Sequence, residues 1–143
     1  MSDLEPRVLL VDDDPAIHRT VARMLRRFEV CSAYSGPSAV REIEAALAGG
    51  ADYALVILDV AMPGWSGLDT LEQIWKIAPE MQALFCTGSK LSHEELQRRF
   101  GDTDAILAIT KPFSQLELAQ AAQTLTTKWR LQRQARAHVD ALE

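Results

Sequence analysis

The chain has 143 residues, of which 48% are hydrophobic and 24% are charged, and its formal net charge is −5. This length predicts one domain that can bury a core without metal or disulfide cross-links, and the composition excludes a disordered chain. The negative charge disfavours direct nucleic-acid binding, and no apolar run reaches the roughly 20 residues of a membrane span.

The cysteines and the amino-terminal residues bear on redox state and targeting. Cys31 and Cys86 each lie in a short apolar run, which predicts buried reduced thiols rather than a disulfide or a metal site. Residues 1–7 contain no apolar segment of the kind that a signal peptide requires. We therefore expect a cytoplasmic protein without a membrane partner.

The first half of the chain alternates short apolar runs with amphipathic stretches. Val8–Val11 predicts a strand that is covered on both faces. Asp14-Pro15 predicts the N-cap and first position of a helix whose apolar face is Ile17, Val21, Met24, Leu25 and Phe28. Val30–Tyr34 predicts a weaker strand near an edge. The helix after it ends at the glycine pair 49–50 and has an inner face of Val40, Ile43 and Leu47.

The second half continues the same alternation and ends differently. Tyr53–Leu58 is the most hydrophobic run and predicts a central strand. Further strands are expected at Gln82–Cys86 and Ala105–Ile109, and helices at 68–77 and 92–100. Five strands alternating with five helices predict an α/β fold, (βα)5, with a doubly wound parallel five-stranded sheet.

The last predicted helix is much longer than such a domain needs. It runs from Ser114 to roughly Ala141, and about 28 residues at ~1.5 Å each give roughly 42 Å. Its basic residues are expected to form a solvated face, and its broken apolar stripe suggests pairing with another helix. The cations are Lys128, Arg130, Arg133 and Arg136, and the stripe is Trp129, Leu131, Ala135, Val139 and Leu142.

Polar residues follow four of the predicted strands. Asp12 and Asp13 follow the first strand, Asp59 the third, Thr87 the fourth and Lys111 the fifth. In an open parallel sheet, ligands bind beyond the carboxyl ends of the strands, so these side chains are expected to meet. Neighbouring carboxylates repel one another unless a cation is present, and Mg²⁺ suits such a site. A carboxylate nucleophile, a metal, a lysine and a hydroxyl donor predict a phosphoryl-transfer site.

Four segments carry a resemblance to a known family. VLLVDDDPAI, VILDVAMPGWSGLD, CTGS and ITKPF resemble, in order and spacing, the receiver domain of two-component response regulators, of the CheY-like kind. The resemblance covers about Arg7 to Thr127. It implies strand order 2-1-3-4-5, a receiver domain at 1–127, and a helical extension or linker at 128–143.

The resemblance also implies roles for individual residues. Asp59 would be the phospho-acceptor, with Thr87 and Lys111 as its catalytic partners and Lys111-Pro112 as a cis peptide. Mg²⁺ would be held by Asp12, Asp13, Asp59 and the backbone carbonyl of Ala61. The phosphoryl group would come from a sensor histidine kinase or a histidine phosphotransfer protein. The chain would then be a switch with self-catalysed phosphotransfer and autodephosphorylation rather than an enzyme.

Three features keep alternatives open. The family usually has Tyr or Phe three residues before the lysine, where this chain has Ala108, so the relay of phosphorylation is in question. The last helix suggests a homodimer or a downstream output module, and whether the sequence is a fragment of a longer protein stays open. A phosphorylation-independent adaptor that dimerises through this helix is the alternative function. A phosphohydrolase is disfavoured because Ala61 stands where its general acid would be.

Several conspicuous side chains receive simpler interpretations. Asp14 is expected to cap a helix rather than bind the metal. Trp65 either gates the site or is an exposed loop residue without a role. His18, His93 and His138 lack metal-ligand spacing, so none is expected to be a ligand or catalyst.

Overall fold

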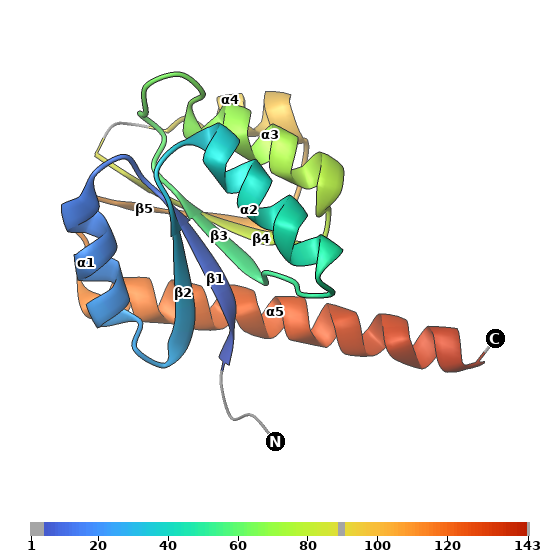
Figure 1. Cartoon of the computed structure of the whole chain (residues 1–143). Helices are drawn as coiled ribbons and strands as arrows, with labels where there is room; N and C mark the ends of the chain where they lie inside the picture. The colour runs from blue at the N-terminus through green and yellow to red at the C-terminus, as the bar shows by residue number, and fades with distance from the viewer. Residues whose placement is uncertain (1–4, 89–90, 143) are drawn as a thin grey trace.

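The structure is a computed structural model of the chain, and it describes residues 5–88 and 91–142. A parallel sheet of five strands runs through the molecule in the order β2-β1-β3-β4-β5 (Figure 1). This order confirms the one implied by the resemblance, with β3 central and β2 at an edge. The strands are β1 (Glu5–Val11), β2 (Phe28–Ala33), β3 (Leu55–Leu58), β4 (Gln82–Thr87) and β5 (Ile106–Thr110).

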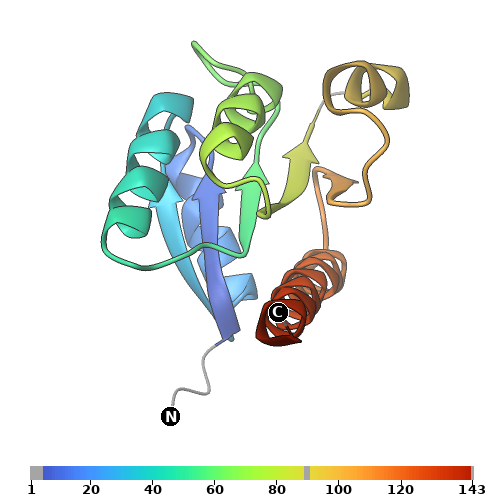
Figure 2. The same cartoon turned by 90° about the vertical axis from the view of Figure 1, so that its right-hand side faces the viewer.

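Helices cover both faces of the sheet. Figure 2 shows α2 and α3 on one side of the strands, with α1 and α5 on the other. This arrangement confirms the doubly wound α/β fold and its long last helix. The helices are α1 (Pro15–Met24), α2 (Gly36–Ala48), α3 (Gly67–Ile77), α4 (His93–Phe100) and α5 (Gln115–Leu142).

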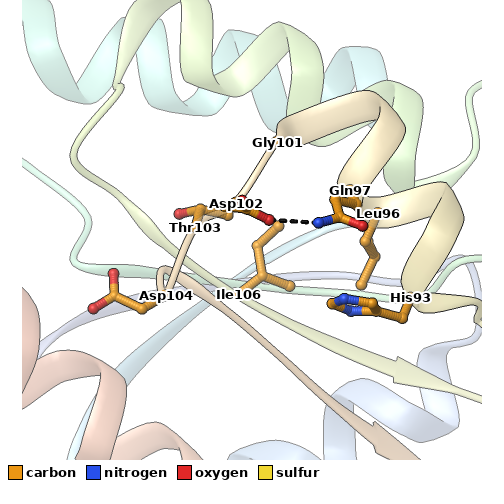
Figure 3. A pocket seen from close by; sticks show the side chains of 8 residues that line it. All are labelled: His93, Leu96, Gln97, Gly101, Asp102, Thr103, Asp104 and Ile106. Atoms are coloured by element: carbon orange, nitrogen blue, oxygen red, sulfur yellow. Dashed lines mark hydrogen bonds between the residues drawn. The ribbon is translucent and has the colours of Figure 1, made fainter.

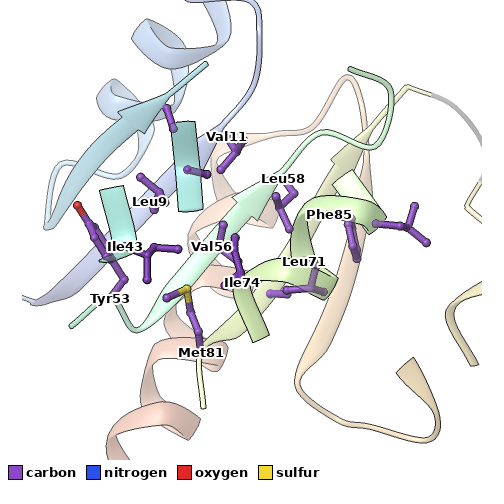
Figure 4. Packing of buried hydrophobic residues seen from close by; sticks show 14 residues of the cluster. Leu9, Val11, Ile43, Tyr53, Val56, Leu58, Leu71, Ile74, Met81 and Phe85 are labelled. Carbon is purple, nitrogen blue, oxygen red and sulfur yellow. The ribbon is translucent and has the colours of Figure 1, made fainter. Parts of the chain in front are cut away.

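Alternate residues of the central strands enter two separate hydrophobic clusters. Leu9, Val56 and Phe85 pack with Ile43 of α2 and Leu71 of α3 (Figure 4). Their neighbours in the strands pack against α1 and α5 in the second cluster; these are Leu10, Leu55, Ile57 and Leu84. Both faces are therefore buried, which explains why these strands are continuous apolar runs. Each fully buried Leu or Phe contributes about 1.5–3 kcal/mol to folding.

Strand register brings the ends of β1, β3 and β4 to one edge. Val11 pairs with Leu58, and Leu58 pairs with Phe85. The residues that follow β1 and β3 are Asp12 and Asp59, so they emerge beside each other. This edge is where ligands bind in open parallel sheets.

Local capping explains most of the helix starts. Two residues, Phe28 and Leu47, differ from their predicted positions. The Asp14 side chain accepts a hydrogen bond from the N–H of Ala16 at 2.9 Å, which confirms its role as N-cap of α1. Phe28 was expected on the first helix but opens β2, because α1 ends at Met24. Leu47 was expected on the inner face of α2 but is 38% exposed.

The two cysteines differ in their surroundings. Cys86 is buried, and burial raises the pKa of its thiol to about 12. Cys31 is only partly buried, and its sulfur accepts a hydrogen bond from Arg7 at 3.6 Å. The expectation of a buried thiol is confirmed for Cys86 and is wrong for Cys31, because β2 lies at the sheet edge.

The last helix is packed along one part of its length and exposed along the rest. Leu118, Ala122 and Leu125 of α5 are fully buried against the sheet. Residues 131–142 are exposed, and this part of the helix projects past the sheet (Figure 1). No helix within residues 5–88 and 91–142 combines the length and hydropathy needed to cross a membrane.

Three cations of α5 pair with acidic residues that directly precede three neighbouring strands. Arg133 and Arg136 are exposed, as expected of a solvated basic face, but all three cations also have a partner in the body of the domain. The Arg133 guanidinium also lies 4.8 Å from the centre of the Trp129 ring. The pairs are Lys128 with Asp104 at 3.2 Å, Arg133 with Asp52 at 2.6 Å, and Arg136 with Glu80.

Candidate functional site

Three carboxylates meet at the carboxyl edge of the sheet. Ligand atoms of Asp12, Asp13 and Asp59 all lie within 4.8 Å of one another. Asp12 is 2% exposed, Asp59 is half-buried and Asp13 is exposed. The cluster therefore has a closed inner side and an open outer side.

Lys111 places one cation in the same cluster. Its Nζ lies 3.1 Å from Oδ2 of Asp12 and 3.6 Å from Oδ2 of Asp59. The backbone N–H of Lys111 donates to the carbonyl of Thr87 at 2.9 Å, which ties the loop after β5 to the end of β4. The peptide bond between Lys111 and Pro112 is cis, as the resemblance implied.

Burial and charge shift the ionisation of Asp59 and Lys111. Burial raises the pKa of Asp59; the lysine opposes this, while Asp12 and Asp13 add to it. Burial lowers the pKa of Lys111, but the hydrogen bond that Lys111 donates to Asp12 and the negative charge of Asp12 reverse that effect and raise the pKa overall. Lys111 is thus held as a cation, and its single positive charge only partly neutralises the negative charges of the three carboxylates.

The donor set fits a hard divalent cation. Three carboxylates and one ammonium leave two negative charges at the cluster. Oxygen ligands on an open edge match the preference of Mg²⁺, which keeps waters and leaves room for a phosphate oxygen. Asp12, Asp13 and Asp59 are the residues that would hold it. The assignment of the Ala61 carbonyl as a further ligand stays a prediction, although a backbone hydrogen bond from Ala61 also lowers the pKa of Asp59.

A close backbone contact fixes the segment that carries Asp59. A Cβ atom at Gly67 would lie 2.3 Å from the carbonyl oxygen of Asp59. The N–H of Gly67 donates to the carbonyl of Val60 at 2.9 Å. The first residue of α3 therefore packs directly on the segment that carries Asp59, and only glycine permits this approach.

Thr87 and Ala108 lie beside a small cavity. Thr87 ends β4 and is 2% exposed, while Ala108 lies on β5 and is exposed. A hollow of about 250 Å³ is lined by Thr87, Leu91, Ala108, Ile109, Thr110 and Glu117. The missing aromatic ring at position 108 therefore coincides with open space next to the predicted switch hydroxyl.

The sequence interpretation missed one neighbour of this site, His18, and left the role of Trp65 open. Trp65 packs at the start of α2, where a Cβ on Gly36 would lie 2.7 Å from its ring, so it is not simply an exposed loop residue. His18 is buried, and its Nε2 lies 2.7 Å from the carbonyl oxygen of Asp12. Metal-ligand spacing could not identify it, because its partner is a backbone atom. The signal was its place one turn into the helix that follows the acidic pair.

A larger hollow of about 660 Å³ lies between α4 and the start of β5 (Figure 3). Among its lining residues, Gln97 donates a hydrogen bond to Asp102 at 2.6 Å. None of the predicted site residues lines it. The chemistry-bearing residues therefore gather at the sheet edge and not in this hollow.

Comparison with known proteins identifies the class to which this fold and this cluster belong. Residues 8–123 match the family model described as the response regulator receiver domain. The chain therefore belongs to the response regulator receiver family, which works in two-component signal transduction as a signalling switch and not as a classical enzyme.

Individual relatives agree with this membership. The chain is 33% identical over 114 residues to the uncharacterized transcriptional regulatory protein YrkP of Bacillus subtilis, covering 78% of this chain and 46% of that protein. It is 33% identical over 121 residues to the regulatory protein VanRB of Enterococcus faecalis, covering 83% and 51%. The chain thus spans about half the length of these two curated relatives.

Solved structures give the same fold. A CheY-like receiver domain protein from Methanospirillum hungatei superposes with a TM-score of 0.76 at 23% identity, covering 91% of this chain and 99% of that one. The chemotaxis protein CheY4 of Vibrio cholerae gives 0.70 at 25% identity, covering 85% and 98%.

Proposed function

We propose that this chain accepts a phosphoryl group on Asp59 and works as a phosphorylation-dependent switch. The observation that carries the proposal is the cluster of Asp12, Asp13 and Asp59 with Lys111 between two of the carboxylates. Family membership supplies the donor class, which is a histidine kinase or a histidine phosphotransfer protein. Residues 1–127 are the receiver unit in this proposal, and 128–143 connect it to an output module or to a second copy.

The transfer needs few protein groups. An Asp59 carboxylate oxygen attacks the phosphorus of a phosphohistidine, the P–N bond breaks, and the released imidazole takes a proton from solvent. Lys111, which contacts Asp12 and Asp59 at rest, moves its ammonium to an oxygen of the transferred group. The Thr87 hydroxyl donates to another of these oxygens.

Asp12, Asp13 and Asp59 would hold Mg²⁺, which would supply neutralisation of charge on the phosphoryl oxygens. Reversal to the resting state follows by hydrolysis. Water attacks the phosphorus, inorganic phosphate leaves, and Asp59 regains its carboxylate. The open side of the cluster at Asp13 gives donor and water their access.

Small-molecule phosphorylation tests the proposal. The protein is incubated with acetyl phosphate with and without Mg²⁺, and its intact mass is recorded. We expect one added phosphoryl group that depends on Mg²⁺ and is absent from Asp59→Ala. Equal addition to wild type and variant, or none to either, would reject the proposal. Asp140→Asn, on an exposed position of α5, is the control that should still be modified.

A second candidate function is favoured by the cavity at Ala108 and by the exposed apolar residues of α5. Leu131 is 58% exposed and Leu142 is 74% exposed, so this part of the helix offers an uncovered surface. An adaptor that dimerises through α5 without phosphorylation would use that surface. It predicts that the mass of the assembly in solution is unchanged by Asp59→Asn and by acetyl phosphate, whereas a phosphorylation-driven switch predicts a change.

A further inference from the structure

His18 occupies a buried position between the acidic turn and the second strand. It is 6% exposed and lies on α1. Its Nε2 lies 2.7 Å from the carbonyl oxygen of Asp12, and its Nδ1 lies 2.7 Å from the hydroxyl oxygen of Ser32. A carbonyl oxygen can only accept, so Nε2 carries the proton and donates to Asp12.

Tyr34 closes this arrangement on its outer side. Its ring centre lies 4.2 Å from that of His18, with 33° between the planes, and Tyr34 itself is 50% exposed. The imidazole is therefore held by a tilted neighbouring ring and by hydrogen bonds at both nitrogens. A side chain held this way has little freedom to turn away from the Asp12 carbonyl.

Every polar group of Asp12 has a partner in this geometry. Its N–H donates to the carbonyl of Ala33 at 3.2 Å, and its Oδ1 accepts from the N–H of Asp14 at 2.9 Å. Its Oδ2 accepts from Lys111 at 3.1 Å. The carbonyl is the last group, and His18 is its donor. That carbonyl belongs to the peptide unit joining Asp12 to the exposed Asp13, so its direction sets where the backbone of Asp13 begins.

We propose that His18 is a positioning residue for the acidic pair. By holding the Asp12 carbonyl, it orients the peptide between Asp12 and Asp13 so that both carboxylates face the same cation. Without this donor, the buried carbonyl would be unsatisfied and the peptide would tilt to reach water. The inference rests on the proposed function, since Mg²⁺ is the cation concerned. Residues that orient metal ligands typically change metal affinity by 10–100-fold when replaced.

The test is a titration of the protein with Mg²⁺ in the absence of any phosphodonor. Binding is monitored through the NMR amide signals of residues 12–14. His18→Leu removes the donor and is expected to weaken Mg²⁺ binding by about tenfold. His18→Gln, whose amide nitrogen can replace Nε2, should stay close to wild type. Ser32→Ala removes the other hydrogen bond and leaves the Asp12 contact, so it should also stay close to wild type.

A second readout separates positioning from general damage. At saturating Mg²⁺ the acetyl phosphate reaction of His18→Leu should approach the wild-type maximal rate, so the defect lies in the Mg²⁺ requirement. Wild-type Mg²⁺ affinity in His18→Leu, or an equal loss in Ser32→Ala, would overturn the inference. If the Leu variant does not fold, His18→Asn, too short to reach the carbonyl, takes its place with the same expectation. A wild type that binds Mg²⁺ but is never phosphorylated would reject the proposed function alone.

Discussion

At Asp59, burial and two neighbouring carboxylates oppose the ionised form that a nucleophile requires. The pKa in the folded chain is raised, so the charged side chain costs stability at neutral pH in the absence of metal. Asp59→Asn should therefore stabilise the metal-free protein by roughly 1 kcal/mol in urea unfolding.

The pH dependence of that gain follows from the sign of the shift. Below the unfolded-state pKa, Asp59 is protonated in both the folded and the unfolded wild-type protein. Asp59→Asn therefore does not increase the free energy of unfolding at that pH. The gain develops as pH rises through the raised folded-state pKa and then stays constant. A variant that is less stable than wild type at neutral pH without metal would contradict this account. Asp140→Asn, at an exposed position of α5, serves as its control.

At Ala108, a small side chain leaves space next to Thr87. Ala108→Tyr should place a ring in the cavity of about 250 Å³ and stabilise the protein by about 1 kcal/mol through apolar burial. The rate of phosphorylation by acetyl phosphate should not change, because Ala108 takes no part in the transfer. Ala108→Ser is the matched variant without a ring. A severalfold loss of rate in the Tyr variant alone would place position 108 within the transfer site.

The residues of the cluster could be predicted because they occupy fixed places after strands. Asp12, Asp59 and Lys111 follow apolar runs directly, so topology alone brings them to one edge. His18 could not be predicted this way, since its importance depends on a contact with a backbone carbonyl. Cys31 was misjudged although its strand was predicted near an edge, because an apolar run does not say which side chains an edge strand leaves partly exposed.

Among the elements, α3 packs through its first residue, Gly67, against the backbone of Asp59 and Val60. Gly67→Ala would bring a methyl group into the Asp59 carbonyl, and both the close atoms and their neighbours are backbone. We expect a loss of about 1–3 kcal/mol in unfolding free energy and slower phosphorylation, because the segment that carries Asp59 must shift.

Gly49→Ala provides the comparison for this substitution. A Cβ at Gly49 would meet its nearest atom at 3.6 Å, an ordinary contact, so this variant should keep wild-type stability and rate. If Gly67→Ala and Gly49→Ala have the same unfolding free energy and the same phosphorylation rate, the close contact between Gly67 and the segment that carries Asp59 does not matter for either property.

The extension of α5 is fixed to the domain by ion pairs at the ends of other elements. Asp52 and Glu80 precede β3 and β4, and they pair with Arg133 and Arg136. Exposed pairs of this kind contribute roughly 0.5 kcal/mol each. Asp52→Asn combined with Glu80→Gln should therefore speed amide hydrogen exchange in residues 130–142 by about two- to fivefold. Added salt should do the same to wild type, while Glu94→Gln on α4 should not; unchanged exchange in the double variant would contradict the pairing.

Element boundaries were harder to predict than element types. The helical spacing of Phe28 suited α1, but pairing of β2 with β1 begins there and takes precedence. The basic residues of α5 were expected to face solvent, and Arg133 and Arg136 do, but the sequence does not show which acids the fold brings within reach of them. Tertiary contacts decided both cases.

For the whole molecule, the sheet order and both helical layers followed from alternation and from the resemblance, and the structure confirms them. The fold brings the acidic cluster to one edge and directs residues 131–142 of the long last helix past the sheet (Figure 1). Ala108 and the length of α5 are the two features in which this chain departs from the usual receiver. Both bear on how phosphorylation of Asp59 would be passed on to a partner.

The most direct measurement locates the modification. The protein is phosphorylated with acetyl phosphate and Mg²⁺ and reduced with borohydride, which converts an aspartyl phosphate to homoserine, and its peptides are then sequenced by mass spectrometry. The account predicts homoserine at position 59, with Asp12 and Asp13 unchanged. Homoserine at another aspartate, or at none despite Mg²⁺ binding, would contradict the assignment of Asp59 as the acceptor.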